Sequence, residues 1–390
     1  MKHTPTSRRT RPTADAEQLI FLANRLSESS SRIEDTFWET RLAELVNRLL
    51  SKGEEETLIA ALDPLYRSGS PAYDALADMI ESCTETRYAS SPNEPDALMI
   101  AVPILAWSRF PIPSGPIPPT HLETIRTHLQ AHILAAEAKL GLCNVLYSPD
   151  QLPQTWSDTA RLADKLAQAA FHGRDLKINP QQLVETMGFL SDSRYLLAVI
   201  AAPHGAPLFR WQETAGDRAA AIRQWTLQGT AALRPLLPAC ALEIQPVGAY
   251  HATVRDADRA SRPWSLRSAV AFLKTVLNLA STDLHAVVAA FHDQQLEEYR
   301  IGFTLRDSND VIHGVIWPLL DSEDENSDLL TQIETILRDA GVQRITLLDH
   351  RLPLEYCDDC GAPLYPNPEG EPVHAELPEE QTETAPRHLH

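Results

Sequence analysis

A similar order of predicted strands and helices recurs three times along this chain. Three segments open with an apolar run typical of a buried strand, continue into a helical pattern and close with a second strand. They begin near Ala97, Arg194 and Glu298, at intervals of about 100 residues. Because strands joined through helices form mixed sheets, the sequence predicts an α/β (mixed α+β) protein with N-terminal helices, three repeated β(β)αβ units and a C-terminal zinc-knuckle-like segment.

The predicted divisions of the chain follow from changes in residue pattern and composition along it. Leucines recur every three or four residues in the first 90 positions, which predicts helices there, and helical patterns are also expected ahead of each strand, including NPQQLVETMGFL and STDLHAVVAAF. The predicted divisions are a disordered basic arm (1–13), a helical region (14–90), a first α/β unit with trailing helices (95–190), a second (191–293), a third α/β unit (296–350), the knuckle segment (351–378) and a disordered tail (379–390).

Composition excludes several classes of partner. The net charge of −19 repels phosphate backbones, so nucleic-acid binding is not expected. The longest apolar run, LLAVIAAP, is far shorter than a membrane-spanning helix, and no apolar stretch follows the N-terminal arginines as in an export signal. We therefore expect a cytoplasmic protein without membrane contact, whose five cysteines stay reduced unless a metal holds them.

The strongest chemical signal is CDDCG, in which Cys357 and Cys360 are spaced for a shared metal. Two thiolates at this spacing, followed by glycine, are typical of half of a tetrahedral zinc site. His374 and His350 are the candidates that complete it. The alternative is a redox pair, but a thioredoxin-type pair opens a helix, and the proline-rich residues that follow here prevent one.

A related pattern, His374-x-Glu376, is reminiscent of zinc deaminases, where such a glutamate moves protons for a metal-bound water. In those enzymes the cysteine pair follows the histidine, whereas here it precedes it. The reversed order argues against deaminase chemistry.

Two further clusters admit a functional and a structural interpretation. His121, His128 and His132 would face one side of a helix and could bind a metal, but Leu129 stands where a zinc protease has its glutamate, and solvated histidines are the simpler explanation.

A second cluster lies beyond an expected strand that carries His251. Arg255, Arg259 and Arg262 could bind an anion at a strand end, or form an ion-pair network in a loop with the neighbouring aspartates.

Long stretches of the chain resemble an uncharacterised bacterial family, a domain of unknown function. The resemblance is carried by EYRIGFTLRDSNDVIHGVIWPL, EYCDDCGAPLYPNPEGEPVHAELPE, RYLLAVIAAPHGAPLFRWQE and DALMIAVPILAWSRFPIPSGP. It implies a bacterial, cytosolic protein and transfers no activity.

Two classes of function remain open. The first is a non-catalytic interaction or regulatory protein with a structural zinc knuckle, acting on a protein partner. The second is an enzyme that acts on a small anionic molecule in a pocket lined by His128, His132, His251 and the arginine cluster at strand carboxyl ends. Convergence of those side chains in one pocket would favour the enzyme.

Overall fold

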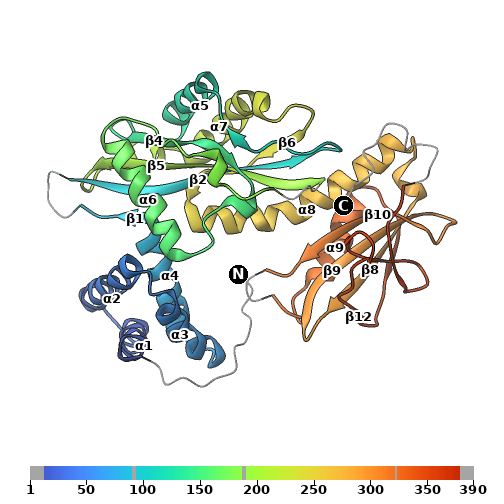
Figure 1. Ribbon diagram of the computed structural model, residues 1–390, viewed down its shortest axis with the longest axis horizontal. Helices are drawn as coiled ribbons and strands as arrows, with labels where there is room; N and C mark the ends of the chain where they lie inside the picture. Colours follow the sequence, from blue (N-terminus) through green and yellow to red (C-terminus); the bar gives the residue numbers. More distant parts are fainter. Residues whose placement is uncertain (1–12, 90–93, 187–189, 321–322, 378–390) are drawn as a thin grey trace.

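The computed structural model describes residues 13–89, 94–186, 190–320 and 323–377. It contains an N-terminal group of helices and two α/β units, each built on its own sheet (Figure 1). The expected mixed α/β class is confirmed. The helices are α1 (Ala14–Ser27), α2 (Arg32–Lys52), α3 (Glu55–Arg67), α4 (Ala72–Glu85), α5 (Pro119–His132), α6 (Trp156–Phe171), α7 (Arg218–Leu233), α8 (Tyr250–Val276) and α9 (Leu329–Asp339).

Strands of the first sheet come from the middle of the chain and those of the second sheet from its last third. The first sheet contains β1 (Thr86–Arg87), β2 (Pro95–Trp107), β3 (Gly115–Pro116), β4 (Lys139–Tyr147), β5 (Ser191–Pro203), β6 (Ala241–Ile244) and β7 (Gly248–Ala249). The second contains β8 (Leu284–His292), β9 (Leu296–Leu305), β10 (Val311–Pro318), β11 (Arg344–Leu347) and β12 (Leu352–Pro353), and a small ribbon pairs β13 (Tyr365–Pro366) with β14 (Pro372–Val373).

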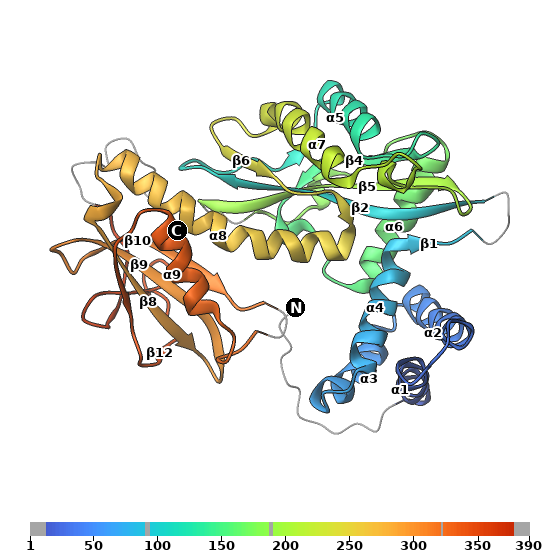
Figure 2. The same cartoon turned by 180° about the vertical axis from the view of Figure 1, so that it is seen from behind.

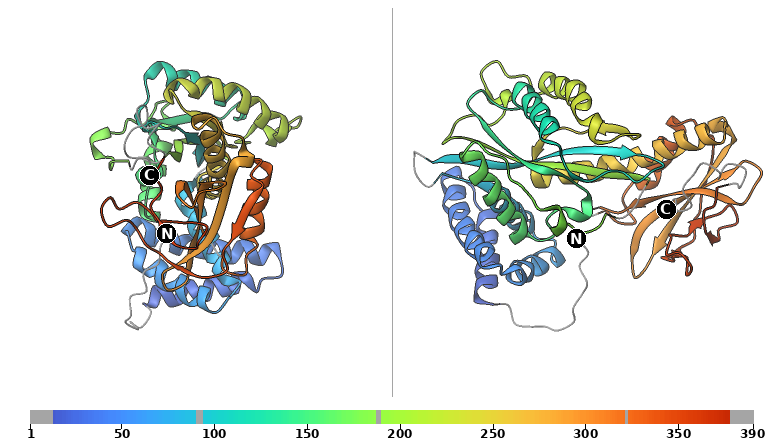
Figure 3. Two further views of the ribbon diagram at one scale, coloured as in Figure 1. Left: turned by 90° about the vertical axis from the view of Figure 1, so that its right-hand side faces the viewer. Right: turned by 45° about the horizontal axis from the view of Figure 1, so that its top comes forward.

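The N-terminal helices α1 to α4 pack around their own leucine-rich core. Local signals set their starts: the Thr13 and Ser31 side chains accept hydrogen bonds from the first turns of α1 and α2. Helix α4 leads into β1, and α4 also packs against α6 (Figure 3). This places the helical group on the side of the first sheet that carries α6.

The first sheet interleaves two β-α-β crossovers. Strands β2 and β5 pair antiparallel along their full lengths. Strand β2 continues through α5 to β4, which pairs with β5, and β5 continues through α7 to β6, which pairs with β2. Each crossover therefore joins two parallel strands with an antiparallel strand between them, which is the split β-α-β arrangement.

Helices cover both faces of this sheet. Helices α5 and α7 lie together on one face, while α6 and α8 lie on the other (Figures 1 and 2). Strands β2 and β5 are buried on both faces, which explains why they are continuous apolar runs in the sequence instead of alternating ones.

The second sheet has a different connectivity, so the expectation of three equivalent repeats is corrected. Strands β8, β9 and β10 form an antiparallel meander, and after α9 the return strand β11 pairs parallel with β8. In the first two segments the return strand runs parallel to the opening strand, whereas β11 runs antiparallel to β9. The order of elements along the chain is similar in all three, but strand pairing depends on long-range contacts that this order does not specify.

Two predicted helices are also corrected. STDLHAVVAAF contains strand β8, because its apolar run is buried on both faces of the second sheet. NPQQLVETMGFL contains only a short 3-10 turn at Pro180–Gln182 within its described part. A short apolar run fits a buried strand as well as a helix, so periodicity alone does not separate the two.

Helix α8 connects the two units. Its first half packs on β2 and β5, and its second half, with Leu266, Val270 and Leu273, enters the core of the second unit (Figure 2). The strand expected at His251 and the loop expected at Arg255–Arg262 are therefore both parts of one helix, although Pro263 lies inside it.

In the described part of the chain, no helix is both long and apolar enough to cross a membrane. The expectations for the basic arm, apart from Thr13, and for the acidic tail concern residues outside the described ranges.

Candidate metal centre

The C-terminal segment comprises residues 351–377. It begins with β12, which pairs with β8, and most of the remainder lies on the face of the second sheet opposite α9 (Figures 1 and 2). Two glycines make room for it. Gly302 and Gly314 are paired across β9 and β10, and a Cβ at Gly302 would lie 2.2 Å from the Pro366 carbonyl oxygen. Strand β13 can therefore lie directly on the sheet, where larger side chains would hold it away.

Arg300, on β9, binds the same segment through hydrogen bonds. This fully buried side chain donates hydrogen bonds of 2.7 Å from Nη1 to the carbonyl oxygens of Glu355 and Leu364. Its Nε donates to Glu298 at 2.7 Å, and its guanidinium lies over the rings of Phe291 and Tyr356. Since Glu355 and Leu364 flank the cysteine turn on either side, one side chain fixes both ends of that turn.

The turn itself has the geometry of a metal knuckle. The Cys357 amide donates to the Ala362 carbonyl oxygen at 2.7 Å, and the Gly361 amide donates to the Cys357 carbonyl oxygen at 2.8 Å. Gly361 has φ +70°, a left-handed conformation that favours glycine and explains its place directly after Cys360. The predicted absence of a helix here is confirmed.

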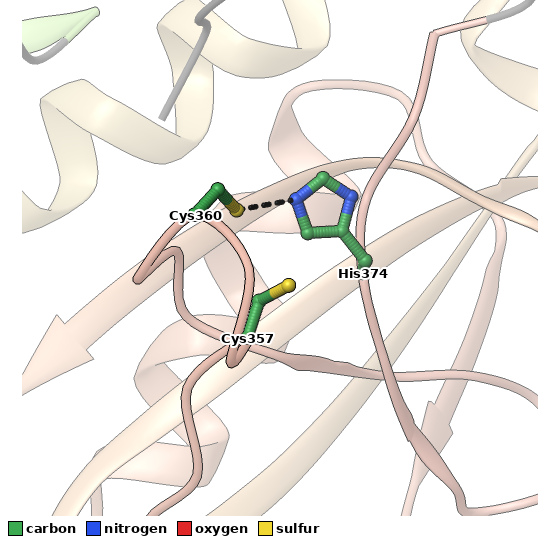
Figure 4. Close-up of side chains that lie close together, drawn as sticks. All are labelled: Cys357, Cys360 and His374. Atoms are coloured by element: carbon green, nitrogen blue, oxygen red, sulfur yellow. Dashed lines mark hydrogen bonds between the residues drawn. The ribbon is translucent and has the colours of Figure 1, made fainter.

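Three potential ligand atoms converge at this turn. The Sγ atoms of Cys357 and Cys360 and a ring nitrogen of His374 lie within 4.8 Å of one another, and Cys360 Sγ is 3.3 Å from His374 Nε2 (Figure 4). Zinc–sulfur and zinc–nitrogen bonds of about 2.3 and 2.0 Å place tetrahedral ligands roughly 3.5 Å apart. These three residues can hold a metal ion.

The surroundings of Cys357 favour its thiolate, which is the form that binds a metal. Backbone amides of Cys360 and Asp359 donate to the Cys357 thiolate and lower the pKa of Cys357. The opposite holds for the isolated thiols, since burial raises the pKa of Cys83 to about 11 and that of Cys143 to about 12. The knuckle therefore differs chemically from these core cysteines.

Glu376 provides an outer contact for the histidine. Its Oε1 lies 3.5 Å from His374 Nδ1, while Nε2 is the nitrogen that faces Cys360. A carboxylate at the far ring nitrogen is the usual means of fixing the orientation of a metal-binding imidazole. The Glu376 amide also donates to the Val311 carbonyl oxygen at 2.8 Å, which anchors this residue to the second sheet.

His350, the other histidine expected to complete the site, lies outside the group. Its Nε2 is 3.2 Å from the carbonyl oxygen of Gly370, to which it donates a hydrogen bond. Within the described ranges, the convergent ligands are thus two cysteines and one histidine.

The histidine face of α5 does not form a metal group in the described part of the chain. His128 and His132 stack with ring centroids 6.0 Å apart, and His132 Nε2 is 3.1 Å from Gln228 Oε1 on α7. These contacts lie within α5 and between α5 and α7, on one face of the first sheet.

The arginines of α8 are engaged in ion pairs. Arg255 pairs with Glu81 on α4, Arg259 with Asp256, and the buried Arg262 with Glu323 through two hydrogen bonds of 2.6 and 2.9 Å.

His251 lies near Arg255, and its Nε2 is 2.6 Å from Thr84 Oγ1. Since α5 and α8 cover opposite faces of the first sheet, His128 and His132 share no pocket with His251 or the arginines (Figure 1).

Sequence reasoning missed Arg300, Gly302 and Gly314 as supports of the metal centre. An arginine within the apolar run of EYRIGF signals a buried cation, but the two carbonyl oxygens that it binds in the C-terminal segment lie more than 50 residues away in the chain. Glu376 stands out in the sequence only as part of a deaminase-like pattern.

The fold and the site define a class: a mixed α/β protein of two sheet-based units that carries a Cys-Cys-His cluster on its second sheet. The chain belongs to the family described as "Protein of unknown function (DUF2863)", whose model matches residues 4–388. No curated protein and no solved structure was found to match the chain.

Proposed function

We propose that this chain is a cytoplasmic, non-catalytic interaction or regulatory protein whose C-terminal segment is held by a structural zinc ion. The observation that carries the proposal is the convergence of Cys357, Cys360 and His374 on one point. Two thiolates with an imidazole favour zinc over magnesium or calcium, which prefer oxygen ligands.

A structural role follows from how little core the C-terminal segment has. Leu352, Ala362 and Tyr365 are its buried hydrophobic residues, and much of the remainder is polar or proline-rich. A structural zinc site can contribute on the order of 10 kcal/mol to local folding. Zinc would therefore supply the stability that hydrophobic burial does not.

A binding role is favoured because the expected catalytic side chains are dispersed over two faces of a sheet. The N-terminal helices also expose large apolar side chains: Phe21, Ile33 and Phe37 are 50, 87 and 46% exposed. Arg25 and Arg41 lie over the rings of Phe21 and Phe37. Aromatic residues combined with arginine are typical of protein interfaces, so a protein is the preferred partner over a small anion.

The test is native mass spectrometry of the full chain purified from its source cells. We expect one zinc per chain and a retained protein partner. The double variant Cys357→Ser/Cys360→Ser should lose the zinc, while the matched control Cys83→Ser, an isolated cysteine in the helical core, should keep it. A disulfide between Cys357 and Cys360 in freshly isolated protein would instead support the redox alternative.

Metal retention and partner retention test separate parts of the proposal. Zinc bound without any retained protein, together with turnover of a small anion, would reject the interaction role but not the structural role of the zinc ion.

A further inference from the structure

The two cysteines of the knuckle are the accessible thiols among the five cysteines of the chain. Cys360 is exposed and Cys357 is half-buried. The other three, Cys83, Cys143 and Cys240, are buried. Burial raises the pKa of each of these three, which keeps them in the unreactive thiol form. A small oxidant therefore meets the two knuckle cysteines first.

The sulfur atoms of these two residues are close enough to form a disulfide after a small movement. They lie within 4.8 Å of each other, and both belong to one turn (Figure 4). Backbone hydrogen bonds close this turn, from the Cys357 amide to Ala362 and from the Gly361 amide to Cys357. Arg300 holds the turn from both sides. Since none of these contacts involves a metal, the two thiols stay adjacent whether or not a metal is bound.

A metal bound here would join two parts of the C-terminal segment. The cysteines belong to the turn, whereas His374 directly follows β14 in the returning part, residues 372–377. Strand β14 pairs with β13 over only two residues of each strand. The Glu376 amide donates to the Val311 carbonyl oxygen. Loss of the metal should therefore loosen the returning part more than the turn.

Carboxylates surround the exposed side of the turn and limit which oxidants approach it. Asp358 and Asp359 lie between the two cysteines in the sequence, and both are exposed, as is Glu355. Glu376 lies beside His374. Negative charge of this kind repels anionic oxidants such as glutathione disulfide, whereas it does not act on an uncharged peroxide.

From these observations we propose that Cys357 and Cys360 are a site of reversible oxidation by peroxide, which forms a disulfide between them and releases the zinc ion together with the returning part of the segment. This inference rests on the zinc site of the proposed function and adds its regulation.

The reaction balances with one hydrogen peroxide. One thiolate attacks a peroxide oxygen and becomes a sulfenic acid as the O–O bond breaks and hydroxide leaves. The second thiolate attacks the sulfenic sulfur, the S–S bond forms and a second hydroxide leaves. Two protons convert both hydroxides to water, so two electrons pass from sulfur to oxygen. Since the thiolate is the form of cysteine that binds metals, His374 then remains as one ligand of the original three.

The test uses the full chain, purified with a reductant in the absence of air and first shown to hold one zinc ion. A slight excess of hydrogen peroxide, in the presence of a chromophoric chelator, should release one zinc per chain. Peptide mass spectrometry should then find the disulfide between Cys357 and Cys360. Reduction followed by added zinc should restore the bound metal. Glutathione disulfide at the same concentration should release zinc at least tenfold more slowly.

A glutamate-specific protease reports on the returning part. Oxidation should speed cleavage after Glu376 severalfold, because its connection to the turn is lost. Cleavage after the exposed Glu355 should not change, since Arg300 still binds the carbonyl oxygen of that residue.

Variants separate the role of the second thiol from the binding of the metal. Cys360→His keeps three ligands but has one thiol, so release by peroxide should be at least fivefold slower. Cys357→His serves the same purpose if the first variant binds no zinc. The matched control Cys83→Ser should behave as the native protein. Asp358→Asn/Asp359→Asn should speed release by glutathione disulfide severalfold and leave release by hydrogen peroxide unchanged.

The outcomes distinguish this inference from the proposed function. A reduced native chain without zinc would reject the zinc site and this inference together. Bound zinc that peroxide does not release, release without the disulfide, equal rates with both oxidants, or unchanged cleavage after Glu376 would overturn the oxidation site alone.

Discussion

The ring of Tyr365 lies directly on Gly314: a Cβ at Gly314 would come within 2.3 Å of three ring carbons. Gly314 is in β10 of the second sheet, and Tyr365 opens β13 of the C-terminal segment. Tyr365 is itself buried. The metal-binding segment can therefore take this position only because residue 314 of the sheet is a glycine, which has no side chain.

Gly314→Val is therefore expected to displace Tyr365, although valine is the better strand residue. Overpacking of this kind destabilises by about 1–3 kcal/mol, and we expect the loss to fall on the C-terminal segment. Competition with a chromophoric chelator should show faster zinc release. The double variant Gly314→Val/Tyr365→Leu should recover part of the loss; if its loss equals the sum of the losses of Gly314→Val and Tyr365→Leu, the two residues are not coupled.

Arg300→Lys should free the cysteine turn from the sheet. Lysine keeps the charge but has one nitrogen, which cannot replace both Nη1, the donor to Glu355 and Leu364, and Nε, the donor to Glu298. Loss of part of these buried hydrogen bonds should destabilise the segment by about 2–4 kcal/mol. Limited proteolysis should then cut within residues 355–364.

The matched control for this variant is Arg194→Lys. Arg194 is also buried in a strand and donates to the carbonyl oxygens of Ile112 and Pro113, but it belongs to the first sheet. Cleavage of the C-terminal segment in both variants alike would contradict the role assigned to Arg300.

Glu376→Gln should weaken zinc binding by about tenfold, because outer partners of metal-binding histidines contribute at this level and Glu376 lies 3.5 Å from His374 Nδ1. Glu371→Gln, on the same segment, is the control and should have no effect. His350→Ala should leave zinc affinity within about twofold of the native protein, since it removes no ligand. A large loss for His350→Ala would place His350 in the metal site after all.

The free energy of unfolding should depend on pH through two groups at the junction of α4 and α8, Glu85 and His251, whose pKa values are shifted in opposite directions. Burial raises the pKa of Glu85 from 4.5 to about 7 and lowers the pKa of His251 from 6.5 to about 4. Glu85 contributes stability below about pH 4.5, and this contribution is lost as the pH rises to about 7. The contribution of His251 is present above pH 6.5 and is lost as the pH falls towards 4.

Glu85→Gln separates the two effects. The free energy of unfolding of this variant, taken relative to that of the native protein, should increase by on the order of 2 kcal/mol from pH 4.5 to pH 8. Urea unfolding at both pH values measures this change. Glu44→Gln, on the exposed side of α2, serves as the control and should show no such change. A gain that is the same at both pH values would mean that Glu85 keeps an ordinary pKa in the folded protein.

The features that could be predicted from the sequence depend on residues that are close together along the chain. The apolar runs of β2 and β5 were predictable because strands buried on both faces are continuously hydrophobic. The metal cluster was predictable in part for a similar reason: Cys357 and Cys360 are fixed by one turn, and His374 follows within the same small segment.

Tertiary structure decided the rest, because pairing and packing join residues that are distant in sequence. The apolar run of β8 is compatible with a helix until β9 and β11 pair with it on either side. Whether His350 or His374 approaches the cysteines depends on where β14 and Gly370 lie, and this depends in turn on the space above Gly302 and Gly314. Local composition limits which elements can form, but the contacts that choose among them, and thereby assemble a site, exist only in the folded chain.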